Sequence, residues 1–213
     1  MAACASQEPI TTAGERLGKA RFAEQIPVHV LAELRTDHAG ETGAVMIYRG
    51  VLSVSRNQAV REFAHHHLCT ESQHLEIMGA LLPRRFQSRL LPMWRIAGWL
   101  TGAVPSIFGP KAVYATIQAV ETFVDRHYHA QIEMIDALRN TPQDRRSLTS
   151  HYLTRHRAMT EIRELLNVCR MDELMHRDDA KSRWQGRPGF LLGFWLHCVS
   201  VGSAVAVKIS RRI

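Results

Sequence analysis

Two short motifs in this sequence combine the residue types and the spacing of metal ligands. Glu71 and His74 form one Glu-x-x-His motif, and Glu173 and His176 form a second one in the other half of the chain. Residues three apart lie on the same face of an α-helix, so each motif would direct a carboxylate and an imidazole to one side. Mixed carboxylate and imidazole sites suit iron or manganese. Each motif therefore predicts part of a metal site.

Two further glutamates complete a ligand pattern. Glu41 lies on the helix expected before the first motif, and Glu121 lies on the helix expected before the second. One Glu from each of two helices and Glu-x-x-His from each of two others is the ligand set of dinuclear carboxylate sites in four-helix bundles. Four buried carboxylates without a cation would be costly, and two divalent ions relieve that cost. The predicted ligands are Glu41, Glu71, His74, Glu121, Glu173 and His176.

Helices are the elements that must position these residues. Apolar or small residues recur at helical spacing in four segments, with prolines near several of their ends, and no segment has the pattern of a strand. The segments are about 32–56, 57–82, 110–138 and 145–182. The fourth is long enough to be two helices, and the long stretch between the last two glutamates predicts an extended connection. The sequence predicts an all-α protein with one domain over residues 1–213 and a tail over about 1–27.

Apolar stripes run along these helices on the faces that carry the predicted ligands. Leu34 and Tyr48 share a face with Glu41, and Ile117 shares a face with Glu121. A helix turns such a stripe toward the core of a protein. We therefore expect the four glutamates to be buried.

Other polar residues near the motifs have less specific roles. Asp37, one turn before Glu41, either orients a ligand histidine or forms a salt bridge on the helix face. Three consecutive histidines, His65, His66 and His67, point in three directions from a helix and cannot form one site. We expect His67 to approach the interior of the bundle and the other two to be solvated.

The overall composition excludes several classes of protein. The four cysteines show no Cys-x-x-Cys spacing, which argues against a zinc ribbon, an iron–sulfur cluster or a secreted disulfide framework. Lys and Arg outnumber Asp and Glu by 27 to 20, for a net charge of +7. That excess favours a nucleic acid or an anionic membrane surface as a partner. The N-terminal stretch has no apolar signal core, and its Glu8 and Glu15 fit poorly with a mitochondrial presequence.

Two apolar segments, 90–109 and 189–207, lie outside the four predicted core helices. The first is interrupted by Pro92, Arg95 and Pro105, so it is not a simple membrane span, whereas the second is long enough for one. Tryptophans and basic residues gather in or beside both segments: Trp94, Trp99, Trp184, Trp195, Arg84, Arg85, Arg89, Arg95, Lys208, Arg211 and Arg212. This combination is typical of interfacial attachment to anionic lipid. The alternative is that both segments are extra helices that cover the bundle.

Three stretches resemble a known family. LRTDHAGETGAVMIYRG (34–50) resembles the first-helix motif of the demethoxyubiquinone hydroxylases, the di-iron monooxygenases of ubiquinone biosynthesis. VETFVDRHYHAQI (120–132) resembles their third-helix motif, and MDELMHRDDA (171–180) resembles the fourth. The similarity runs from about residue 31 to the C-terminus.

This resemblance implies a ferritin-like four-helix bundle in which the six predicted ligands bind two iron ions. It also implies that His127 and Tyr128 lie behind the ligands or face the quinone, and we predict the same of Asp37 and Tyr48. The implied activity is hydroxylation of a polyprenylated demethoxy-benzoquinol by O2 and two electrons, with NADH as the electron source. The sequence has no Gly-x-Gly-x-x-Gly fingerprint for a dinucleotide, so a reductase partner or reduction through the quinone stays open.

The expected location is peripheral, on the cytoplasmic face of a bacterial inner membrane or on the matrix side of the mitochondrial inner membrane. A ubiquinone-biosynthesis complex, a lipid-presenting partner and an oligomer all fit. Three other interpretations remain: a ferritin-like iron-storage or peroxidase protein, a di-iron tRNA hydroxylase, and a membrane-bound lipid carrier. Nucleic acid is not the expected partner, because the basic residues cluster beside apolar stretches.

Overall fold

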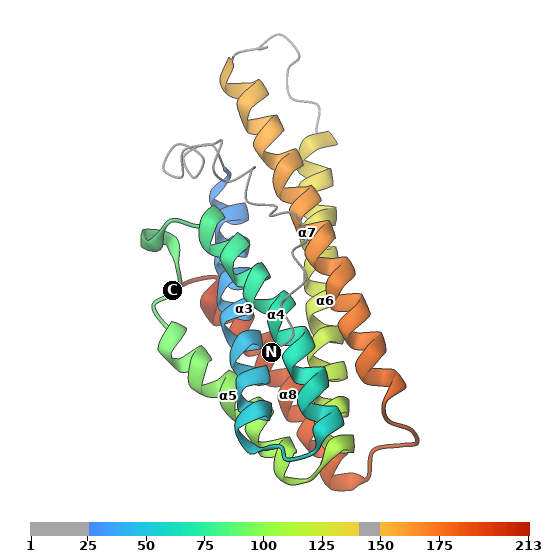
Figure 1. Cartoon of the computed structure of the whole chain (residues 1–213). Coiled ribbons are helices and arrows are strands. Elements are labelled where there is room, and N and C mark those ends of the chain that lie inside the picture. Colours follow the sequence, from blue (N-terminus) through green and yellow to red (C-terminus); the bar gives the residue numbers. More distant parts are fainter. Residues whose placement is uncertain (1–25, 141–149) are drawn as a thin grey trace.

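The computed structural model describes residues 26–140 and 150–213, and its regular elements in these ranges are helices. Four long helices run side by side, and two more cover them (Figure 1). The elements are α3 (Val28–Val54), α4 (Gln58–Leu81), the 3-10 helix η1 (Arg84–Phe86), α5 (Leu91–Ile107), α6 (Pro110–Asn140), α7 (Ser150–Ser182) and α8 (Phe190–Ser210). The prediction of an all-α, ferritin-like bundle with additional apolar helices is confirmed.

Local chemistry explains where the core helices begin and end. Pro27 precedes α3 with a φ of −55°, and Pro110 is the first residue of α6, where its missing N–H costs nothing. Asn57 caps α4, because its side-chain oxygen accepts a hydrogen bond of 3.1 Å from the backbone N–H of Val60. Pro83 follows the end of the same helix. The observed ends of these helices lie within a few residues of the predicted ends.

The fourth core helix differs from its prediction. α7 runs unbroken from Ser150 to Ser182, so this range holds one helix rather than two, and the first predicted residues, 145–149, lie outside the described part. α6 continues to Asn140. Most of the segment between Glu121 and Glu173, for which the sequence predicts an extended connection, is therefore helical. As a result, α6 and α7 extend past the ends of α3 and α4 (Figure 1).

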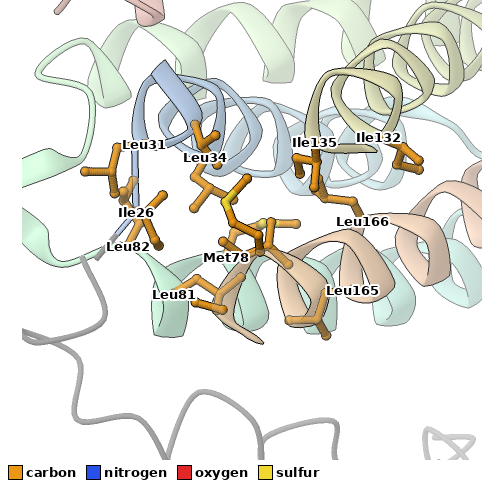
Figure 2. Packing of buried hydrophobic residues seen from close by; sticks show 14 of the residues in the cluster. Ile26, Leu31, Leu34, Met78, Leu81, Leu82, Ile132, Ile135, Leu165 and Leu166 are labelled. Carbon is orange, nitrogen blue, oxygen red and sulfur yellow. The ribbon is translucent and has the colours of Figure 1, made fainter. Parts of the chain in front are cut away.

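The core consists of two apolar clusters along the bundle axis. In the first, Leu34 of α3, Met78 of α4, Ile135 of α6 and Leu166 of α7 lie together (Figure 2). The second contains Ile47, Phe63, Val113 and Ile117, among others. Along every core helix, residues of one cluster precede the predicted ligands and residues of the other cluster follow them. The predicted ligands therefore occupy a polar layer with an apolar layer on either side.

Glycine allows α5 to pack directly against the backbone of α3. A Cβ atom added at Gly102 would lie 1.9 Å from the carbonyl oxygen of Ile47, and one at Gly98 would lie 2.3 Å from the carbonyl oxygen of Gly43. A third close approach joins Gly50 of α3 to the backbone of α5. No larger residue fits these positions without moving a helix.

We expect Gly102→Ala to lower the free energy of unfolding by about 1–3 kcal/mol, because the new methyl group overpacks a backbone contact. Gly193→Ala in α8 is the matched control, since nothing lies within 4 Å of a Cβ atom there. The control should be neutral or stabilising by up to about 1 kcal/mol. Chemical unfolding of both variants measures the difference, and equal stability of the two would refute the close packing.

α5 and α8 expose much of their apolar surface. α5 packs against α3, and α8 packs mainly against α6. Met93 and Ile96 of α5 are exposed, as are Phe190, Leu191 and Phe194 of α8. Within the part of the chain that the structure describes, α8 is the one helix whose length and composition would allow it to cross a bilayer.

Candidate metal centre

Side chains from all four core helices meet in the polar layer. Glu41 comes from α3, Glu121 from α6, and each of α4 and α7 contributes a Glu-x-x-His pair. None of these six residues is more than 3% exposed. Helical spacing explains the arrangement, because residues three apart on α4 and on α7 project inward together. The structure thus brings together every predicted ligand: Glu41, Glu71, His74, Glu121, Glu173 and His176.

The six residues form two overlapping groups of four. Glu41, Glu71, His74 and Glu173 make one group, and Glu71, Glu121, Glu173 and His176 make the other. Within each group the possible ligand atoms all lie within 4.8 Å of one another. Glu71 and Glu173 belong to both groups. Each group would hold one divalent ion, with one histidine in each group and with Glu71 and Glu173 available to both.

The contacts between these side chains are close. Nδ1 of His176 lies 2.9 Å from Oε1 of Glu71 and 3.4 Å from Oε2 of Glu173. Nδ1 of His74 lies 3.1 Å from Oε1 of Glu173. Both histidines therefore turn the Nδ1 atom toward the carboxylates.

The electrostatics of the cluster favour cations. Burial raises the pKa of Glu41 and Glu121 well above the usual range, and the neighbouring carboxylates of Glu71 and Glu173 add to the effect. Burial opposes protonation of the histidines, but the nearby carboxylates of Glu173 and Glu71 still raise the pKa of His176 to about 10. Without metal, protons must take the place of part of the missing positive charge.

The carboxylate oxygens fit two divalent ions. Oε2 of Glu41, Oε2 of Glu71 and Oε2 of Glu173 are buried without a hydrogen-bond partner within the described residues. Such atoms are costly unless a cation or a donor satisfies them. Four carboxylates and two imidazole nitrogens are also the donor types that iron and manganese prefer. The residues present therefore fit a dinuclear iron or manganese centre.

Two tyrosines hold the outer carboxylates. The hydroxyl of Tyr48 donates a hydrogen bond of 3.1 Å to Oε1 of Glu121, and the hydroxyl of Tyr128 donates a short one to Oε1 of Glu41. Burial raises the pKa of both phenols well above the usual range, so both stay protonated and act as donors. Each tyrosine therefore lies directly behind one predicted ligand.

Asp37 and His127 belong to a separate polar network beside the cluster. Oδ1 of Asp37 accepts a hydrogen bond of 2.6 Å from the amide of Gln131, and Nε2 of His127 lies 2.8 Å from Oγ1 of Thr36. The two predicted residues also approach each other at 3.4 Å. Asp37 thus contacts a histidine that is not a predicted ligand. An aspartate does contact a predicted ligand histidine, but it is Asp172, whose Oδ2 lies 3.1 Å from Nε2 of His74.

A cavity of about 410 Å³ reaches the carboxylates of the candidate metal centre. Helices α3, α5, α6 and α8 supply most of its lining, and α4 and α7 add Glu71 and Glu173 beside Glu41 and Glu121. Most of the remaining lining is apolar or small, with Trp94 of α5 and Trp195 of α8 on the two outer helices. The cavity therefore gives an apolar molecule access to the carboxylates.

Comparison with known proteins identifies the family. The family model for "Ubiquinone biosynthesis protein COQ7" matches residues 29–210. The chain belongs to the COQ7 family. The match covers all six predicted ligands and both helices outside the four-helix core.

Several relatives of this COQ7-family chain have named activities. It is 40% identical over 105 residues to a 3-demethoxyubiquinol 3-hydroxylase of Rhodospirillum rubrum, across 48% of this chain and 50% of that protein. It is 35% identical over 109 residues to an NADPH-dependent mitochondrial 3-demethoxyubiquinone 3-hydroxylase of Dictyostelium discoideum, across 48% of each. The chain thus spans about half the length of these two relatives. A protein of the latter name from Caenorhabditis elegans is 25% identical over 184 residues, across 84% of this chain and 88% of that protein.

Sequence reasoning missed two acidic partners of the COQ7-family site. Asp172 directly precedes a predicted ligand, and Asp179 lies 2.9 Å from Nε2 of His67. His67 is buried and His65 and His66 are exposed, as predicted. Burial and the neighbouring His176 lower the pKa of His67 to about 4 despite Asp179, so its ring is neutral at ordinary pH. The only feature of the sequence that could have indicated a role for Asp172 is its position beside Glu173.

Proposed function

We propose that this protein hydroxylates the ring of a polyprenylated demethoxy-benzoquinol in ubiquinone biosynthesis, as a di-iron monooxygenase that uses O2 and two electrons. The observation that carries the proposal is the buried group of four glutamates and two histidines with two shared carboxylates. Membership of the COQ7 family and the names of the relatives support the substrate class.

Two iron ions would be held by Glu41, Glu71, His74, Glu121, Glu173 and His176. When bound, iron would supply the reduction of O2 and the transfer of one oxygen atom to the ring. The protein would hold the ligands in position and shield the ions from water. Tyr48 and Tyr128 fix the outer carboxylates by hydrogen bonds, and Asp172 fixes His74. The two apolar clusters exclude water from both sides of the polar layer.

The cavity suits the head of a quinol. A volume of about 410 Å³ lies in the range of small-molecule sites, and its lining is mainly apolar. His127 and Asp37 line the same cavity and are the polar groups that would orient ring oxygens. A polyprenyl tail would leave between α5 and α8, where the lining is apolar.

The electron source is a further part of the proposal. We take NADH as the co-substrate, while the names of the Dictyostelium and rat relatives specify NADPH. The sequence has no Gly-x-Gly-x-x-Gly fingerprint for either dinucleotide. Electrons would therefore reach the centre from a reductase partner or through the bound quinone.

We further propose that α5 and α8 attach the protein to the surface of an anionic membrane. Their exposed apolar side chains and the basic residues beside them, such as Arg95 and Lys208, support this location. The membrane would be the cytoplasmic face of a bacterial inner membrane or the matrix side of the mitochondrial inner membrane, since relatives of both origins exist. A complex of biosynthetic proteins would form there.

Ile96→Glu is expected to weaken binding to vesicles that contain anionic lipid by about tenfold, because it places a charge on the attached surface. Ile96 is 64% exposed. Met175→Glu on α7 is the control, since Met175 is 60% exposed on a helix outside the proposed membrane surface. Co-sedimentation with vesicles compares the two. Equal loss in both variants, or none in either, would contradict the assignment of this surface.

Reconstitution tests the proposed reaction. The protein is loaded anaerobically with Fe(II), and O2, NADH and a short-tailed demethoxy-quinone are then added. Mass spectrometry of the extracted quinone should find a product one oxygen atom heavier, and Glu71→Ala should form none. Oxidation of iron without any quinone product would contradict the hydroxylase and favour an iron-storage, peroxidase or RNA-modifying role.

A further inference from the structure

The two outer helices that wall the cavity are attached to the core in different ways. α5 packs on α3 through glycine, with Gly98 and Gly102 directly against backbone atoms. α8 stands away from the core at its middle, because a Cβ atom added at Gly202, which lines the cavity, would meet nothing within 4 Å. α8 is therefore the wall that moves with the smaller loss of packing.

Side-chain hydrogen bonds fix α8 near its beginning and just beyond its end. Nε1 of Trp195 donates a hydrogen bond of 2.9 Å to Oγ1 of Thr116 on α6. Just after the helix, the guanidinium of Arg211 meets the carboxylate of Glu33 on α3 at two points, with Nε 2.7 Å from Oε1 and Nη2 2.9 Å from Oε2. Between these two anchors α8 crosses the cavity.

Arg35 of α3 joins further segments to the second anchor. Its Nη1 donates to the backbone oxygen of Arg211 at 3.4 Å, and its Nε donates to the backbone oxygen of Phe86 at 2.6 Å. Phe86 belongs to η1, which precedes α5. Thr36 and Ser210, the neighbours in sequence of Arg35 and Arg211, line the cavity. Polar contacts thus hold three segments together at one end of the cavity.

We propose that the pair of Arg211 and Glu33 is a latch that closes this end of the cavity, and that the phosphate of an anionic membrane lipid opens it. This inference rests on the proposed function, which places the quinol in the cavity and α8 on an anionic membrane. The side chain of Arg211 is 44% exposed, so a phosphate can reach it, whereas that of Glu33 is 13% exposed. A guanidinium binds phosphate through the same two-point geometry that it uses with a carboxylate.

Exposed arginines beside the latch favour a lipid phosphate as the competing anion. Arg84 and Arg85 are exposed in η1, beside Phe86, and Arg212 is exposed beside Arg211. Such a group of cations draws the protein toward the phosphates of an anionic bilayer. The cavity therefore opens on the membrane, where a polyprenylated substrate resides, and stays closed in water.

The latch predicts a kinetic effect rather than an effect on affinity. An ion pair at the protein surface contributes little stability, so breaking this one should speed the opening of the cavity by about twofold to fivefold. Opening limits both entry and exit, so the rate constants of association and dissociation should rise together. The dissociation constant should stay within about twofold, since neither Arg211 nor Glu33 is part of the cavity lining.

Stopped-flow fluorescence of the metal-free, full-length protein tests the latch. The probe is a benzoquinone without a tail, which should quench the fluorescence of Trp94 and Trp195 in the cavity wall. Glu33→Gln and Arg211→Gln should each raise both rate constants about twofold to fivefold. Arg211→Lys keeps the charge but loses the two-point contact, so its rate constants should lie between those of Arg211→Gln and the wild type.

The control variant breaks a surface ion pair far from the latch. Glu161→Gln removes the partner of Arg157 on α7, where Nε of Arg157 lies 3.0 Å from Oε1 of Glu161. Neither residue lines the cavity, so both rate constants should equal those of the wild type. Thermal unfolding of each variant reports its folded state.

Vesicles test the release by lipid. Vesicles that contain phosphatidylglycerol should speed quinone binding to the wild type by the same factor as Glu33→Gln, and they should give Glu33→Gln no further gain. Vesicles of phosphatidylcholine alone, and inorganic phosphate at equal ionic strength, should leave the wild type unchanged. No gain with phosphatidylglycerol, or an equal gain with inorganic phosphate, would overturn the lipid as the releasing anion.

The remaining failures are distinct. A wild type that does not bind the quinone would overturn the proposed function itself. Normal binding with the same rate constants in the wild type, Glu33→Gln and Arg211→Gln would overturn only the latch. Weaker binding together with a lower unfolding temperature in both glutamine variants would also overturn it, because that result indicates a structural role. If either variant does not fold, Arg211→Lys decides the result.

Discussion

Glu71→Gln is expected to abolish binding of both metal ions, whereas Glu121→Gln should remove only one. The reason is that Glu71 belongs to both groups of ligands and Glu121 to one. A glutamine has nearly the same size as glutamate but lacks the charge that two cations require. By the same argument Glu173→Gln should lose both ions, and Glu41→Gln should lose the ion next to His74.

Metal analysis of iron-loaded, desalted variants measures this effect directly. The expected iron content per chain is two for the wild type, one for Glu121→Gln and none for Glu71→Gln. Glu76→Gln is a suitable control, since Glu76 is exposed on the same helix as Glu71. Equal iron content in the Glu71 and Glu121 variants would show that Glu71 is not shared.

The metal-free protein should become less stable as the pH rises from about 6.5 to about 10. Burial lowers the pKa of His176, but the nearby carboxylates of Glu173 and Glu71 outweigh it and raise the pKa from 6.5 to about 10 in the folded state. A raised pKa means that the folded protein binds this proton more tightly than the unfolded chain does. The resulting stabilisation is complete below pH 6.5 and is lost as the pH approaches 10. The raised pKa of His74 acts in the same direction.

Bound metal should reduce this dependence on pH. A cation takes the place of the protons, so the loaded protein keeps its stability over the same range. Urea unfolding across the range, with and without Mn(II), measures the slopes. His176→Gln should flatten the slope of the metal-free protein. A metal-free wild type whose stability is constant or rises with pH would contradict the account.

The four core helices and the six-residue cluster could be predicted from the sequence because their signals are local. Helical periodicity located the helices, and the spacing of Glu71 and His74 indicated that both side chains lie on one face of a helix. Glu41 and Glu121 followed from the repeated order of the helices. The prolines and Asn57 fixed most helix ends to within a few residues.

The remaining features depend on contacts between distant segments, which local patterns do not contain. Asp37 and Asp172 are both acids near a ligand in sequence, but only the packing of α4 against α7 places Asp172 on His74. The pairing of His67 with Asp179 joins residues 112 positions apart. The cavity likewise exists only because α5 and α8 pack on the outside of the core.

The most direct test of the central claim is a crystal structure of the iron-loaded protein, with anomalous scattering data collected at the iron absorption edge. Two strong peaks are expected between Glu71 and Glu173, one beside His74 and the other beside His176. A single peak in this layer, or peaks only at the protein surface, would contradict a dinuclear centre built from these residues.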